Sequence, residues 1–228
     1  MNIKQIEVEL QDQMGNDRSI AEAAWTSSSD RMRKESRTDE DTARVVNLLA
    51  DSKHSVPFES IIFRFWMRVP IFVDRQYMTH RLQSASGMSG RYRTMPSDFY
   101  ELPEDVLAVL KEHSPNSIAT YTSLSRFCNK MYREALDKLK KVKEEGNLSS
   151  SDYKRCREVL RGVLPQGNMT ERVSVINLRS FSNFYKLRSK EDAQPEIQFL
   201  AKGMLERIVE RGQCPIAIEA VSRNNWVI

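Results

Sequence analysis

The strongest constraint on the fold of this 228-residue sequence is the run of residues 60–69, in which every second side chain is apolar. The odd-numbered positions are all apolar: Ile61, Phe63, Phe65, Met67 and Val69. Successive side chains of a β-strand face opposite sides of the sheet, so this pattern predicts a strand with one fully buried face. The fold must therefore include a sheet built around this strand.

Helical spacing, capping residues and turn residues predict the remaining elements. They are strands over residues 3–10 and 170–177, and helices over 19–25, 41–50, 70–80, 103–112, 114–146, 150–163 and 192–212. An apolar stripe that includes Leu124 and Met131 is expected to turn the longest helix toward the core. We expect the polar residues 26–40 to form a mobile loop. Since no repeat or linker interrupts this order, we expect one α+β domain over residues 1–228.

Composition excludes several classes of protein. Hydrophobic residues make up 40% of the chain and charged residues 29%, with a net charge of only +4, so a dedicated nucleic-acid binder is not indicated. No apolar run reaches the roughly 20 residues of a membrane span, and the first residues lack a signal-peptide core. The three cysteines and three histidines are scattered without a CxxC pair. We therefore expect a cytoplasmic protein without disulfides or a metal site.

Residues 75–93 are rich in hydrogen-bond donors. They contain four Arg, three Ser, two Gly and one His, and no acidic residue. Glycine allows close approach of backbone N–H groups to a ligand, and arginine presents a fork of donors that suits phosphate. The composition predicts either an anion site for a phosphorylated small molecule or a basic surface loop. We expect Gln76 and His80 to share one face of the 70–80 helix, and the Ser/Gly-rich residues after it to be irregular.

Other nucleotide or nucleophile motifs are missing from the sequence. There is no GxGxxG fingerprint and no GxxxxGK[ST] loop, so neither a Rossmann dinucleotide site nor a P-loop is supported. No cysteine lies near a histidine or in a charged turn, which argues against a thiolate nucleophile. A second group of amides and guanidiniums occurs at residues 177–188.

The run His80-Arg81-x-x-Ser84-x-x-x-x-Ser89-Gly90-Arg91-Tyr92 resembles the signature of the flavin-dependent thymidylate synthases. Further matches follow in family order along most of the chain. They include His54-x-x-Pro57-Phe58-Glu59, Arg161-x-Val163-Leu164-Pro165, Asn177-x-Arg179-Ser180, Asn183-Phe184 and Leu187-Arg188.

The resemblance implies a mainly antiparallel central sheet packed by long helices, and a homotetramer with active sites at subunit interfaces. It implies methylation of dUMP at C5, with FAD as cofactor and NADPH and methylenetetrahydrofolate as co-substrates. The residues that match the dUMP contacts of the family are Gln76, Ser89, Gly90, Arg91, Arg161 and Arg188. The residues that match its FAD contacts are His80, Arg81, Asn177, Arg179 and Asn183, with His54 and Glu59 near the flavin and the folate. Arg188 matches the catalytic residue that stabilises negative charge on the uracil ring.

The sequence departs from the family signature at several positions. The first Arg of the signature is Thr79 here, and the usual Asn-Glu pair in its middle is Ser86-Gly87. A family Thr is Val56. These departures leave open a related C5-methylase or hydroxymethylase of dUMP or dCMP, and a non-catalytic relative that binds a nucleotide or RNA.

Overall fold

A computed structural model describes residues 5–27 and 35–224 of the chain, which form two compact units. Unit 1 contains Gln5, Arg68–Arg75 and Gly87–Glu171. Unit 2 contains Ile6–Met67, Gln76–Ser86 and the chain from Arg172 on. The prediction of one domain over the whole chain stays a prediction.

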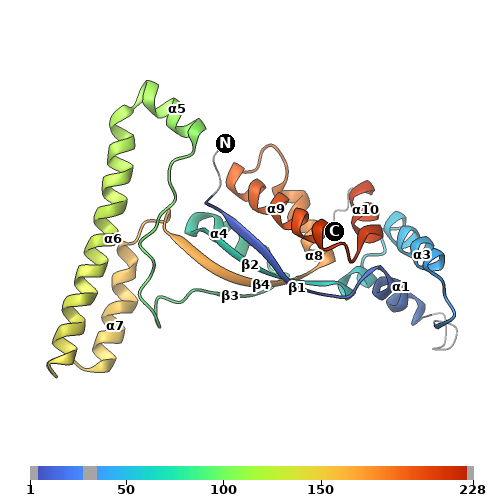
Figure 1. Cartoon of the computed structure of the whole chain (residues 1–228), viewed down its shortest axis with the longest axis horizontal. Coiled ribbons are helices and arrows are strands. Elements are labelled where there is room, and N and C mark those ends of the chain that lie inside the picture. The colour runs from blue at the N-terminus through green and yellow to red at the C-terminus, as the bar shows by residue number, and fades with distance from the viewer. Residues whose placement is uncertain (1–4, 28–34, 225–228) are drawn as a thin grey trace. The chain divides into compact units, whose positions relative to one another are not determined.

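Four strands and nine named helices make up the described elements (Figure 1). The strands are β1 Glu7–Met14, β2 Ile62–Pro70, β3 Ser84–Gly87 and β4 Met169–Asn177, and they form one sheet in the order β1-β2-β4-β3. The helices are α1 Asp17–Trp25, α3 Asp39–Asp51, α4 Ile71–Met78, α5 Glu104–His113, α6 Pro115–Glu144, α7 Ser150–Leu160, α8 Leu178–Arg188, α9 Pro195–Arg211 and α10 Pro215–Arg223. Two short 3-10 segments are η1 Val56–Ser60 and η2 Arg161–Val163.

Strands β2 and β4 run antiparallel. In unit 2 the amide of Leu178 donates to the carbonyl of Ile61 at 2.9 Å, and in unit 1 the amide of Ile71 donates to the carbonyl of Asn168 at 2.9 Å. Residue numbers rise along one strand and fall along the other, which is the antiparallel arrangement. The combination of helices with an antiparallel sheet confirms the predicted α+β class.

The alternation that predicted β2 is confirmed. Phe63 and Phe65 are fully buried, whereas Arg64 between them is exposed. Both phenylalanine rings pack against Phe181 of α8, with ring centroids 6.0 and 6.3 Å apart. Burying aromatic side chains is strongly stabilising, so this packing fixes α8, and with it Arg188 at the end of α8, on the sheet.

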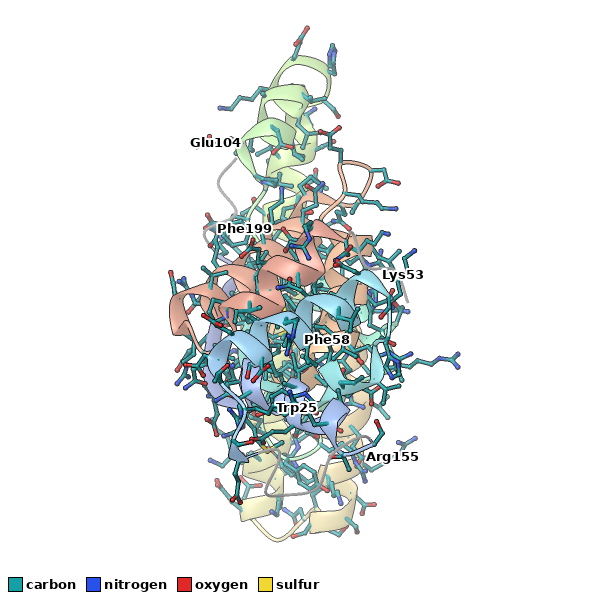
Figure 2. All side chains as sticks on the ribbon, turned by 90° about the vertical axis from the view of Figure 1, so that its right-hand side faces the viewer. Trp25, Lys53, Phe58, Glu104, Arg155 and Phe199 are labelled. Atoms are coloured by element: carbon teal, nitrogen blue, oxygen red, sulfur yellow. The ribbon has the colours of Figure 1, made fainter. Side chains whose placement is uncertain are left out.

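The other helices of unit 2 enclose the rest of its core. Helix α9 packs on β1 and α8, and helices α1, α3 and α10 pack on one another (Figure 1). Trp25 of α1 and Phe58 of η1, both labelled in Figure 2, are 4% and 0% exposed. Gly212, in the left-handed conformation with φ of 66°, ends α9 as expected.

In unit 1, α6 and α7 pack side by side and α5 folds back on α6 (Figure 1). The predicted apolar stripe of α6 is wrong at Leu124 and Met131, which are 56% and 46% exposed. The buried face instead includes Asn129, whose side chain exchanges two hydrogen bonds with that of Asn168 at 2.7 and 3.1 Å. A paired amide satisfies its polar groups when buried, so a polar residue can take this position.

Several predicted boundaries also change. Strand β1 covers Glu7–Met14 and so extends past the predicted end at residue 10, while residues 3 and 4 of the prediction lie outside the described residues. Helix α4 ends at Met78, so Gln76 and His80 do not share a helical face, contrary to the prediction. The Ser/Gly-rich segment, expected to be irregular, contains β3, and next to it the Met88 amide donates to the Glu171 carbonyl at 2.9 Å. Residues 28–34 of the predicted mobile loop lie outside the described residues.

Candidate active site

The side chain of Arg188 in unit 2 is held by two consecutive residues that follow α4, Thr79 and His80. The Nε atom of Arg188 donates to Nε2 of His80 at 2.9 Å. Its Nη2 atom donates to Oγ1 of Thr79 at 3.4 Å. Because the guanidinium is planar, two acceptors along one edge fix both its plane and its direction.

His80 accepts this hydrogen bond as a neutral imidazole whose proton is on Nδ1. Burial is the main cause that lowers the pKa of His80, and the charge of Arg188 lowers it further. The imidazole ring also packs edge-on against Phe184, with centroids 5.0 Å apart and an interplanar angle of 86°. His80 is therefore neutral at neutral pH and orients Arg188 instead of repelling it.

A buried polar network holds the turn that carries Thr79 and His80. The Nε2 atom of Gln83 donates to the carbonyls of Tyr77 and His80, both at 3.0 Å. Its Oε1 atom accepts from Oγ of Ser174 at 2.6 Å, and the same Oγ lies 2.8 Å from the hydroxyl of Tyr77. Gln83 and Ser174 were not among the predicted site residues, although Ser174, a polar residue at a buried strand position, was an available signal.

Gln76 lies away from His80 on α4 and has a different partner. Its side-chain amide donates to the side-chain oxygen of Gln194, the residue that precedes the first turn of α9. This bond uses one of the two N–H donors of the Gln76 side chain. The second N–H and the side-chain oxygen of Gln76 can still bind a ligand.

A cavity of about 600 Å³ in unit 2 is lined by His54 and Glu59, the two residues predicted to lie near the flavin and the folate. Its other lining residues are Ala23, Ala24, Ser27, Leu49, Val56, Pro57 and Ser60. Glu59 Oε1 accepts from Nη1 of Arg179 at 2.6 Å. The Nε atom of Arg179 is buried without a hydrogen-bond partner, an unfavourable state that an acceptor on a ligand would relieve.

The remaining predicted cofactor residues of unit 2 differ in their surroundings. Asn177 caps α8, because its side-chain oxygen accepts from the amide of Ser180 at 2.8 Å. Asn183 is half-buried on α8, and Arg81 is exposed.

Ser89, Gly90, Arg91 and Arg161 come together in unit 1. Gly90 is buried, and a Cβ atom at this position would lie 2.9 Å from Cδ of Arg161. The hydroxyl of Ser89 accepts from the amide of Arg91 at 3.3 Å. Only glycine permits so close an approach of the backbone to the Arg161 side chain, so these residues form a compact group of donors.

Glu158 of α7 supplies a carboxylate to this group. Its Oε1 atom accepts from Nε of Arg91 at 2.8 Å, and its main-chain carbonyl accepts from Nε of Arg161 at 3.1 Å. The hydrogen bond from Arg91 is the main cause that lowers the pKa of Glu158, and the charges of Arg91, Lys154 and Arg155 add to it. Glu158 was not among the predicted site residues, because no local pattern marks a carboxylate that pairs with an arginine 67 residues away in the chain. Arg155, on the same helix, is labelled in Figure 2.

The described side chains offer little for thiol or metal chemistry. Burial raises the pKa of the Cys214 thiol to about 12, so this thiol stays protonated and is a poor nucleophile. Within residues 5–27 and 35–224, no three His, Cys, Asp or Glu side chains are grouped in a way that could hold a metal ion.

Comparisons with known proteins decide the family. The family model described as "Thymidylate synthase complementing protein" matches residues 9–215. A flavin-dependent thymidylate synthase of Thermus thermophilus is 35% identical over 210 residues, which cover 90% of this chain and 72% of the relative. That of Thermotoga neapolitana is 34% identical over 216 residues, covering 93% and 89%. The chain belongs to the flavin-dependent thymidylate synthase family.

Solved structures agree with the fold of a flavin-dependent thymidylate synthase. The UMP/dUMP methylase PolB from Streptomyces cacaoi, in structures bound with 5-Br dUMP and with 5-Br UMP, gives TM-scores of 0.71 and 0.72. Each comparison covers 96% of this chain and 95% of the PolB chain at 23% identity, which supports the fold alone. The family inferred from the run at residues 80–92 is thus confirmed.

Within this family member, the predicted site residues form two groups, one in each unit. Ser89, Gly90, Arg91 and Arg161 lie in unit 1. Gln76, Arg188 and the predicted cofactor residues His54, Glu59, His80, Arg81, Asn177, Arg179 and Asn183 lie in unit 2. The roles of these residues stay predictions.

Proposed function

We propose that the chain catalyses the reductive methylation of dUMP to dTMP, with methylenetetrahydrofolate as carbon donor and NADPH as reductant. The observation that carries the proposal is the guanidinium of Arg188 held by neutral His80. Family membership supports it, because the relatives are flavin-dependent thymidylate synthases and PolB is a UMP/dUMP methylase.

In this proposal Arg188 is the catalytic residue. Negative charge on N3 and O4 of the uracil makes C5 nucleophilic, and a fixed cation beside these atoms lowers the energy of that state. Both acceptors of Arg188 are uncharged, so its positive charge is not neutralised by them. Gln76, with amide atoms that can both donate and accept, would bind the base.

The unit 1 group would bind the phosphate of dUMP. Arg91 and Arg161 supply planar guanidinium forks, and Ser89 supplies a hydroxyl. Gly90 keeps the backbone close to Arg161. A phosphate would replace or share the contact that Arg91 makes with Glu158.

The donors of unit 2 fit FAD. The buried, unpartnered Nε of Arg179 calls for an acceptor, and carbonyl and phosphate oxygens of FAD are acceptors. The residues that would hold FAD are His80, Arg81, Asn177, Arg179 and Asn183, with His54 and Glu59 at the adjoining cavity. When bound, FAD would supply the redox chemistry, with NADPH as its reductant. The chain's own residues bind and orient the nucleotide and supply charge.

We further propose that the two units act as one domain in a cytoplasmic homotetramer, with active sites at subunit interfaces and no metal. Leu124, Phe127 and Met131 are all about half exposed on α6 and fall on one side of it, a surface that suits burial against another subunit. None of the helices in the described ranges combines the length and apolar character of a membrane span. We expect neither a membrane nor nucleic acid as a partner.

The test is a tritium-release assay with 5-tritiated dUMP, methylenetetrahydrofolate, NADPH and FAD. Release that depends on all four components is expected from the purified protein. A yellow preparation that bleaches with NADPH but releases no tritium would overturn the dUMP assignment. A colourless protein that does not take up FAD and binds RNA with a steep salt dependence would overturn catalysis altogether.

A second candidate is a related C5-methylase or hydroxymethylase of dUMP or dCMP. Thr79 and Gly87 motivate it, because they remove a cation and a carboxylate that the family signature carries. The mass of the product separates a methyl from a hydroxymethyl adduct, and parallel assays with dCMP test the base.

A further inference from the structure

We propose that Thr79 is a positioning residue that, together with His80, holds Arg188 in the direction needed to act on the nucleotide base. The inference rests on the proposed catalytic role of Arg188. It assigns a role to a position at which this chain departs from the family signature, where a threonine hydroxyl replaces a cation.

The single proton of the Thr79 hydroxyl is already committed. Oγ1 of Thr79 lies 2.7 Å from the carbonyl of Gln76, to which it donates, and the Thr79 amide donates to the same carbonyl at 3.2 Å. A hydroxyl has one proton and two lone pairs. Toward Arg188 the hydroxyl therefore presents lone pairs, and it can only accept.

Thr79 and His80 bind the same edge of the guanidinium of Arg188. That edge consists of Nε, which donates to His80, and Nη2, which donates to Thr79. A guanidinium carries five N–H bonds, so three remain, all on the end of the group formed by Nη1 and Nη2. The contacts with His80 and Thr79 therefore orient the guanidinium of Arg188 and leave its other end free to donate to an oxygen or nitrogen of the base.

Two uncharged acceptors distinguish Arg188 from the two predicted arginines that are paired with carboxylates. Arg91 is bound by Glu158 and Arg179 by Glu59, both carboxylates. A carboxylate orients an arginine but cancels much of its charge, whereas a hydroxyl and an imidazole orient it and leave the charge available. An arginine at position 79 would add a second cation beside Arg188 and provide no acceptor.

The test compares Thr79→Val, which keeps the shape and removes the hydroxyl, with Thr79→Ser, which keeps the hydroxyl. The matched control is Thr120→Val on α6, because that exposed hydroxyl also donates to a preceding carbonyl, of Asn116 at 2.9 Å, without touching an arginine. We expect Thr79→Val to lower kcat about 3- to 10-fold and to change KM for dUMP much less. Thr79→Ser and Thr120→Val should stay within about two-fold of the parent.

A binding measurement in two backgrounds separates this inference from the function on which it rests. Calorimetric titration with dUMP should show only a small loss of affinity for Thr79→Val, in line with the small change in KM, and no further loss when Thr79→Val is added to Arg188→Ala. If Arg188→Ala retains turnover, the proposed role of Arg188 is wrong. If Arg188→Ala abolishes turnover but Thr79→Val matches Thr120→Val, only the role of Thr79 is wrong. Should Thr79→Val fail to fold, Thr79→Ala removes the same hydroxyl without the added methyl group, and the same outcomes apply.

Discussion

The Nε atom of Arg91 lies 2.8 Å from Oε1 of Glu158, so the arginine proposed to bind phosphate already has a counter-ion within its own chain. The Arg91 side chain is 51% exposed and that of Glu158 is 18% exposed. A phosphate that approaches Arg91 from solvent therefore competes with a carboxylate that is already in place. This hydrogen bond is also the main cause that raises the pKa of Arg91 and lowers the pKa of Glu158.

Removing the charge of Glu158 should tighten the binding of dUMP. We expect Glu158→Gln to lower KM for dUMP about two- to five-fold, because exposed ion pairs are weak and the competition they cause is correspondingly modest. The effect should shrink at high salt, which screens exposed charges. Steady-state kinetics at two ionic strengths measure it, with Glu134→Gln as control because Glu134 pairs with Lys130 at 3.7 Å on α6. A higher KM would mean that Glu158 orients Arg91 instead of competing for it.

A methyl group at Gly90 should disturb the nucleotide site, whereas one at Gly162, the residue after Arg161, should not. In Gly90→Ala the new Cβ would lie 2.9 Å from Cδ of Arg161 and 3.3 Å from the side chain of Met95, so Arg161 must move. We expect KM for dUMP to rise about 5- to 20-fold with a smaller change in thermal stability. Gly162→Ala is the matched control, since its Cβ would meet no atom within 4 Å. Equal KM values for the two variants would contradict the role of this close approach.

The sequence predicted those parts of the fold that are set by local pattern. The alternation over residues 60–69 fixed β2, and Gly212 fixed the end of α9, because both depend on residues next to each other in the chain. The face of α6 was not predictable in this way. Apolar spacing chose Leu124 and Met131, but the buried side carries Asn129, whose partner Asn168 is distant in sequence.

The site was predictable in its members but not in their pairing. The resemblance supplied Arg91 and Arg188, yet Glu158 and Ser174, which act on the surroundings of these arginines, come from elements remote in sequence. Long-range hydrogen bonds of this kind depend on tertiary packing and leave no local periodicity. Thr79 is the exception, because the sequence alone shows that it departs from the family signature at a position close to the predicted site residues.

The hold of His80 on Arg188 should depend on pH. Burial and the charge of Arg188 lower the pKa of His80 below its ordinary value of 6.5. As the pH falls, His80 is therefore protonated in the unfolded chain before it is protonated in the native protein. The contribution of neutral His80 to the free energy of unfolding is complete above about pH 6.5 and is lost as the pH falls through the native pKa. The orientation of Arg188 is lost in the same window, because protonated His80 has no acceptor and repels the guanidinium.

The measurement is the pH profile of kcat/KM for the parent and for His80→Gln, whose amide oxygen can accept at any pH. The parent should lose activity on the acidic side, below pH 6.5, by up to about tenfold per pH unit. His80→Gln should start from a lower activity and show a weaker acidic limb. An acidic limb of the same position and depth in both proteins would assign it to another group.

Ser174 should matter for both stability and turnover, although it lies in a strand and is fully buried. Its hydroxyl donates to Oε1 of Gln83 at 2.6 Å and lies 2.8 Å from the hydroxyl of Tyr77, so Ser174→Ala removes both of these hydrogen bonds. A buried group that loses its partner costs about 1–3 kcal/mol, so the free energy of unfolding should fall by that order in urea titrations at unchanged m-value. The exposed Ser123→Ala should change it by less than about 0.5 kcal/mol.

The same network links stability to the proposed chemistry. Gln83 holds the carbonyl of His80, so a looser Gln83 should let the turn move and lower kcat more than it raises KM for dUMP. Tyr77 and Ser174 share one hydrogen bond, so Tyr77→Phe should destabilise the protein less when added to Ser174→Ala than it does alone. Additive losses would mean that Tyr77 and Ser174 act independently, and the turn that carries Thr79 and His80 would then be held by Gln83 without them.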